Sequence, residues 1–145
     1  MVHVVNKGKV GEREVVKLLQ PTVNEVYEGL GMQAPELHRN QNQSALGGYD
    51  IDGLPWLALE VKRQEQLSLN KWWAQVLKAA REGQTPVVLF RQNRKKWRVL
   101  TWVWLHTGGR GHMRVRAELT LEDFMDWFRE KLKYEAARES ESTGE

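Results

Sequence analysis

Residues 47–63, with the sequence GGYDIDGLPWLALEVKR, constrain the fold more than any other stretch of this chain. They predict two short strands joined by a turn at residues 53–55, where Gly and Pro interrupt the pattern. Strand side chains alternate with a period of two, so the second strand has one apolar face and one charged face. The apolar face comprises Leu57, Leu59 and Val61, and the opposite face comprises Ala58, Glu60 and Lys62. The apolar face requires a hydrophobic core behind it.

The first of these strands carries two acidic residues, Asp50 and Asp52, on the side opposite Ile51. If the strands pair, an Asp and Glu60 converge beside Lys62. Two carboxylates form an oxygen-only site suited to Mg²⁺ or Mn²⁺. Such a metal polarises a phosphodiester, and a lysine can orient the attacking water or stabilise developing charge. The alternative is a solvated strand face with a Glu and a Lys two residues apart, which is very common.

The same stretch resembles the PD-(D/E)xK nuclease superfamily, with Tyr49-Asp50 in place of Pro-Asp and Glu60-Val61-Lys62 as the ExK motif. Residues 7–14, KGKVGERE, resemble the opening helix of archaeal-type Holliday junction resolvases. His38-Arg39, with Ser44 downstream, is similar to the Arg and Ser segment that those enzymes carry before the Asp. The resemblance covers residues 7–99.

This resemblance implies an α/β fold, with a restriction-endonuclease-like mixed central sheet flanked by helices. It implies that Glu12, Asp50, Glu60 and Lys62 are catalytic, and that Asp50, Glu60 and the Val61 carbonyl hold Mg²⁺, for which Mn²⁺ substitutes. The helix after the ExK strand often lends a polar residue in this superfamily, and Gln75 is the candidate. Glu12 could instead simply favour a helix N-terminus, and Gln75 could lie on a solvated helix face.

The charge distribution predicts a polyanionic partner. The net charge is +3, but residues 134–145 contain four Glu and one Arg, so the rest of the chain carries +6. Such a basic body suits nucleic acid. The predicted DNA contacts are Lys7, Lys9, Arg13, Arg39, Ser44, Arg63, Arg94, Lys95 and Lys96. A solvated charged surface is the alternative for each of these residues taken singly.

Hydrophobic periodicity supplies the remaining elements. It predicts helices over 7–20, ending or kinked at Pro21, and over 22–30, 67–82 and 121–133, and strands over 37–39, 86–90, 97–105 and 113–119. In the 67–82 helix the predicted buried stripe is Trp73, Val76, Leu77 and Ala80. Because residues 97–105 are apolar on both faces, this strand is predicted to be central or covered by a partner. We expect Trp102 or Trp104 to contribute to a dimer surface.

The length of 145 residues predicts one domain, residues 1–133, followed by an acidic and disordered tail, residues 134–145. The chain has no cysteine, which excludes disulfides and thiolate metal sites. We also expect no membrane span and no secretory leader. These features favour a cytoplasmic, nucleoid-associated protein, or one of the host cytoplasm if it is viral.

The sequence therefore predicts a Mg²⁺-dependent, structure-selective endodeoxyribonuclease that resolves four-way Holliday junctions in DNA recombination and repair. It is expected to act on branched DNA as a homodimer that cuts paired strands, without a membrane or a small-molecule cofactor. One alternative is another PD-(D/E)xK repair or restriction nuclease acting on linear or flap DNA. The other is a non-catalytic, basic DNA-binding module.

Overall fold

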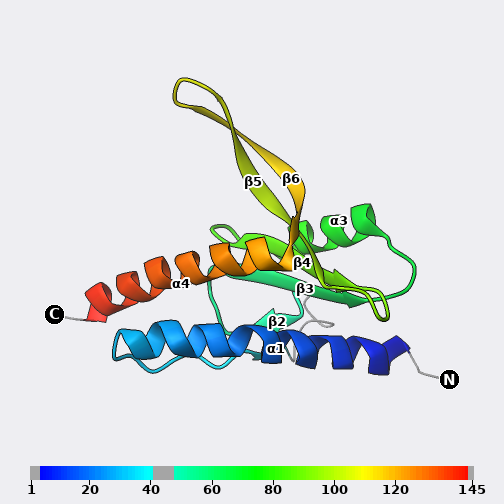
Figure 1. Cartoon of the computed structure of the whole chain (residues 1–145), viewed down its shortest axis with the longest axis horizontal. Helices are drawn as coiled ribbons and strands as arrows, with labels where there is room; N and C mark the ends of the chain where they lie inside the picture. The colour runs from blue at the N-terminus through cyan, green and yellow to red at the C-terminus, as the bar shows by residue number, and fades with distance from the viewer. Residues whose placement is uncertain (1–3, 41–47, 144–145) are drawn as a thin grey trace.

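A six-stranded mixed sheet forms the centre of the molecule, with helices on both faces (Figure 1). The computed structural model describes residues 4–40 and 48–143, with the side chains of residues 8–40 and 48–142. The elements are α1 (Val4–Gly29), β1 (His38–Arg39), β2 (Ile51–Asp52), β3 (Leu57–Arg63), α3 (Leu69–Ala79), β4 (Thr85–Arg91), β5 (Arg98–Gly108), β6 (Gly111–Thr120) and α4 (Leu121–Thr143). The strands lie in sequence order, and β3 and β4 are the parallel pair. The predicted fold class is confirmed.

The long helices α1 and α4 lie together on one face of the sheet (Figure 1). Their apolar side chains recur every three or four residues, which places them on one stripe of each helix. The buried stripes are Val15, Leu19, Val23 and Val26 in α1, and Phe124, Phe128, Leu132 and Ala136 in α4. These stripes pack against Leu57, Leu59 and Val61 of β3, as the alternation predicted. Most of the apolar core therefore lies on this face.

Helix α3 covers the opposite face of the sheet. It buries Trp72, Trp73 and Val76 in a second cluster that includes Ala58 of β3. The predicted stripe was partly wrong, because Leu77 is 40% exposed and Trp72 takes a buried position in its place. On the face of β3 that carries Glu60 and Lys62, α3 therefore covers Ala58. This face is accessible to solvent only towards the end of the strand, at Lys62.

Two sequence predictions need correction. Helix α1 does not end at Pro21 but continues to Gly29. The predicted disordered tail is helical as far as Thr143, where α4 ends; Ala136 is fully buried there, and the Tyr27 hydroxyl donates a hydrogen bond to Glu139. Burial of Val23, Val26 and Ala136 in the core stabilises both helical segments.

Strand β5 was predicted to be central or covered by a partner. It is buried only near its start, and Trp104 is 65% exposed, so the covering partner stays a prediction.

Candidate active site

The turn between β2 and β3 brings an acidic residue against the ExK strand. Gly53 has φ of +128°, and a Cβ there would lie 2.7 Å from the Glu36 carbonyl oxygen, so the turn requires glycine. Strand β2 is short and pairs Ile51 with Leu59. The next residue back, Asp50, donates its backbone N–H to the Leu59 carbonyl at 2.9 Å. Its carboxylate therefore reaches the β3 edge just where the backbone ladder ends.

The carboxylate of Asp50, rather than a backbone carbonyl, accepts the hydrogen bond from a backbone N–H of β3. Its Oδ2 accepts a hydrogen bond from the Val61 N–H at 2.7 Å. This bond fixes the carboxylate beside Glu60, the residue that precedes Val61. Asp52 lies at the turn instead, where its Oδ1 accepts from the Gly53 N–H at 2.9 Å and its Oδ2 is 4.0 Å from His38 Nε2. The two aspartates thus have different surroundings, and Asp50 is the one held against the ExK motif.

Glu60 and Lys62 share one face of β3 and lie close together. The Lys62 Nζ is 3.9 Å from the Glu60 Oε2, and the two side chains are 18% and 8% exposed. Val61, between them, packs into the core on the other face. An amine and a carboxylate therefore lie close together, with little exposure to solvent, at the end of one strand.

Burial raises the pKa values of both carboxyls. Burial is the main cause for Glu60, the negative charge of Asp50 adds to it, and the nearby Lys62 opposes it, with a resulting pKa of about 8. Burial also raises the pKa of Asp50, although the Val61 N–H, Lys62 and a hydrogen bond with Glu60 oppose this. A divalent cation at this place would offset the cost of burying the ionised carboxylates.

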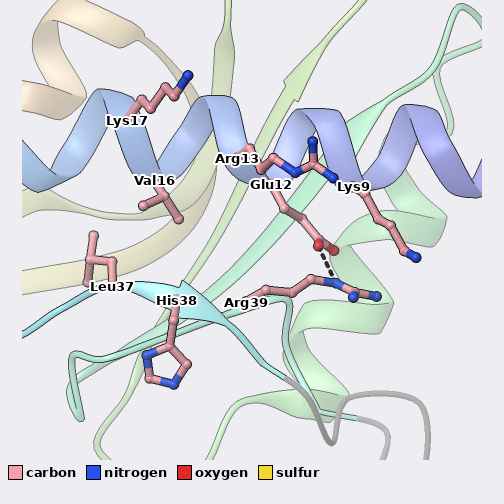
Figure 2. A pocket seen from close by; sticks show the side chains of 8 residues that line it. All are labelled: Lys9, Glu12, Arg13, Val16, Lys17, Leu37, His38 and Arg39. Carbon is pink, nitrogen blue, oxygen red and sulfur yellow. Dashed lines mark ion pairs between the residues drawn. The ribbon is translucent and has the colours of Figure 1, made fainter.

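Glu12 reaches the same region from α1. It is buried, and its charge contributes to the raised pKa of Glu60. Its Oε2 is 2.7 Å from the Nε of Arg39 on β1, and Figure 2 shows this pair. Gly11 permits the approach, because a Cβ there would lie 3.0 Å from the Cγ of Arg63 on β3. Residues from α1, β1, the start of β2 and β3 therefore converge.

A pocket of about 510 Å³ lies beside Glu12 (Figure 2). Basic side chains dominate its lining: Lys9, Arg13 and Lys17 of α1, with His38 and Arg39 of β1. Three of the predicted DNA contacts, Lys9, Arg13 and Arg39, are thus brought together next to the acidic residues. The pocket has the charge expected of a phosphate-binding surface.

The structure places the other predicted site residues differently. Arg63 is held by Glu14 and donates a hydrogen bond to the Asn93 Oδ1 at 2.8 Å, so its guanidinium serves protein contacts rather than facing solvent. Gln75 is exposed on α3. Arg94, Lys95 and Lys96 are exposed in the turn between β4 and β5. The Lys7 side chain and Ser44 lie outside the described residues.

Sequence reasoning missed two residues that organise this site. Glu14 binds both Arg63 and Arg91, whose Nη1 is 2.9 Å from the Glu14 Oε2, and so joins α1 to the ends of β3 and β4. Asn40 donates its backbone N–H to the Asp50 carbonyl at 2.8 Å and its side-chain amide to the Tyr49 carbonyl at 2.9 Å. No sequence signal identifies Asn40, because its role depends on the pairing of β1 with β2.

Within residues 4–40 and 48–143, no group of three or more His, Cys, Asp and Glu side chains is placed to hold a metal ion. A cation here would therefore depend on two carboxylates and a backbone carbonyl. Carboxylate and carbonyl oxygens are the ligands that Mg²⁺ and Mn²⁺ prefer.

Comparison with known families shows the family of this chain. Residues 3–133 match the model of a family described as "phage putative PDDEXK endonuclease". The chain belongs to that family. The resemblance to the PD-(D/E)xK superfamily is thereby confirmed, and with it the assignment as a nuclease. Divalent metals are general in PD-(D/E)xK nucleases. No curated protein and no solved structure gives a match.

The description of the matching family names an endonuclease and does not name its substrate. In the part of the chain that the structure describes, no helix is both long and apolar enough to cross a bilayer.

Proposed function

We propose that this PDDEXK endonuclease is a Mg²⁺-dependent enzyme that cuts four-way DNA junctions in paired strands as a homodimer. The observation that carries the catalytic part is the position of Asp50, whose carboxylate is bound to the Val61 N–H beside Glu60. This contact gathers the motif residues at one strand end, with Lys62 adjacent. A bare DNA-binding module has no need for such a buried acidic pair.

The metal would be held by Asp50, Glu60 and the carbonyl oxygen of Val61. When bound, it would polarise the scissile phosphate and lower the pKa of a coordinated water. The raised pKa values of both carboxyls support this proposal, because a cation favours the ionised forms that burial disfavours.

The protein's own groups have distinct roles in this mechanism. Lys62 is largely shielded from solvent and lies 3.9 Å from Glu60. It would donate a hydrogen bond to the attacking water or to a phosphate oxygen on which negative charge develops. Glu12 would position Arg39 through their 2.7 Å ion pair, so that the rest of the guanidinium can meet a phosphate oxygen. Arg39 is one of the residues that line the pocket in Figure 2.

The junction specificity is supported by the resemblance of residues 7–14 to the opening helix of archaeal-type resolvases. The basic pocket around Glu12 includes Lys9 and Arg13 of this same segment. A two-fold dimer would place two such sites on opposed strands of a junction, which has matching two-fold character.

The test compares cleavage of a labelled four-way junction with cleavage of a linear duplex of the same sequence, with Mg²⁺ and with chelator. We expect paired nicks, on the junction only, that require metal. Asp50→Asn should abolish cutting, whereas the matched control Asp52→Asn should retain most of it. Equal cutting of both substrates would refute the junction specificity. Equal losses of activity in the two variants would refute the choice of Asp50. Tight binding without cleavage would favour a non-catalytic module.

A further inference from the structure

The outer half of the β5–β6 hairpin stands away from the rest of the molecule (Figure 1). Strand β4 pairs with β5 only as far as Thr101, so beyond that residue β5 has β6 alone as its described neighbour in the sheet. The two strands continue together for the length of the hairpin, from the Trp102–Arg116 pair to the Gly108–Gly111 pair. At about 3.3 Å per residue this arm is about 20 Å long. It is a two-stranded ribbon, of which Trp102 at the base packs against the core cluster under α3.

The two faces of this arm differ in chemistry. Directly paired residues share a face in an antiparallel ladder. One face therefore carries Trp102 with Arg116 and Trp104 with Arg114, and we call it the Trp-Arg face. The other face carries Val103 with Val115 and Leu105 with Met113, and we call it the aliphatic face. The arm thus separates its cations from its aliphatic side chains.

The side chains of the Trp-Arg face are preorganised for binding by contacts within the protein. The Arg114 guanidinium carbon lies 4.2 Å from the ring centroid of Trp102 and 5.9 Å from that of Trp104. Trp102 in turn meets Trp73 of α3 edge-on at 5.0 Å, and the Arg116 Nη1 donates to the Asn70 Oδ1 at 2.8 Å. Stacking fixes the guanidinium plane, so Arg114 would lose little side-chain entropy on meeting an anion. Trp104 remains 65% exposed.

The charge of the arm selects its partner. Between Trp102 and Ala117 the sequence has three Arg and two His and no acidic residue. Two copies docked through the Trp-Arg face would bring these cations together, whereas a DNA backbone neutralises them. A two-stranded ribbon also fits the DNA major groove, which is about 12 Å wide and about 8.5 Å deep. The length of the arm exceeds that depth.

We propose that the β5–β6 hairpin is a DNA-binding arm, whose Trp-Arg face grips a duplex segment of the substrate away from the scissile phosphate. This inference rests on the proposed function, because it takes DNA as the substrate. Arg114 contacts a phosphate and Trp104 packs against the sugars or bases in the groove. The arm contributes affinity and no catalytic group.

The test is binding of a fluorescent linear duplex in chelator, measured over a range of salt concentrations. We expect Arg114→Gln to reduce the slope of log K against log salt by about one, because one phosphate contact is lost. Trp104→Ala should weaken binding by about tenfold at every salt concentration without changing the slope, because the burial of an uncharged side chain is lost. In cleavage, both variants should raise KM, because the arm contributes affinity for the substrate.

The matched control is Leu105→Ser with Met113→Ser, on the aliphatic face. These side chains are 54% and 58% exposed, close to the exposure of Trp104, and the double variant should bind as the unaltered protein does. Sedimentation of each variant reports self-association. If the control variant loses both DNA affinity and a dimer, the arm is an interface between copies and the inference is wrong.

Failure of the arm and failure of the proposed function give different results. If the unaltered protein binds and cuts DNA while Arg114→Gln and Trp104→Ala behave identically to it, only the arm is refuted. If the unaltered protein neither binds nor cuts any DNA, both proposals are refuted.

Discussion

The raised pKa of Glu60 predicts that the metal-free protein loses stability as the pH rises. The pKa of Glu60 is about 8 in the folded chain, against an ordinary value of 4.5. In this interval the folded state holds a proton that the unfolded state has released. Stability therefore falls with pH, by at most about 1.4 kcal/mol per pH unit from this one group. Glu60→Gln removes the titrating group and should flatten the dependence.

The magnitude follows from the width of the interval. Between pH 5.5 and pH 8 the unaltered protein should lose about 2–3 kcal/mol of unfolding free energy, somewhat less than the full linkage slope allows, because the pKa of the folded form lies at the upper limit. Glu60→Gln should lose clearly less over the same interval; the part that remains comes from Asp50, whose pKa is also raised by burial.

The assay is urea unfolding in chelator at several pH values, with Mg²⁺ added in a parallel series. Mg²⁺ should restore stability at pH 8 in the unaltered protein, because a ligand that binds only the folded state stabilises it, and should do so much less in Glu60→Gln. Glu82→Gln, at an exposed position after α3, is the matched control and should follow the unaltered protein. A pH dependence that is equal in Glu60→Gln and the unaltered protein would refute the reasoning, and so would stability that rises with pH.

Three further results are expected. Lys62→Met should lower kcat by about 10²–10³-fold and leave DNA affinity nearly unchanged, because the group acts on charge that develops during reaction; a loss of binding alone would contradict this role. Gly8→Ala should stabilise α1 by up to about 1 kcal/mol in urea unfolding, since nothing lies within 4 Å of a Cβ there, whereas Gly11→Ala should lack this gain because its Cβ would lie 3.0 Å from the Arg63 Cγ. Ala136→Asp should lower the free energy of unfolding by about 2–4 kcal/mol, since this position is fully buried. Thermal unfolding that does not change would instead support the prediction of a disordered tail.

The local sequence by itself predicted the strand that carries the ExK motif, and the resemblance of its motifs to a nuclease superfamily predicted the class of fold. The alternation of Leu57, Leu59 and Val61 with Glu60 and Lys62 is a property of any strand with one buried face, so it could be read without a structure. The glycine at position 53 and the parallel crossover to β4 followed from turn chemistry and from the intervening helix. These are short-range signals, encoded within a few residues of where they act.

Only the tertiary structure decided which groups meet. The strand pattern alone did not separate Asp50 from Asp52, and only the resemblance favoured Asp50. The register of β2 on β3 separates the two by placing Asp50 against the Val61 N–H. The partner of Glu12 is Arg39, and no spacing predicts that pair, because it forms across two elements. Likewise, the acidic composition of residues 134–145 suggested disorder, but burial of Ala136 against the core stabilises the helix as far as Thr143. Long-range burial and register are collective properties of the folded chain, which is why local patterns could not supply them.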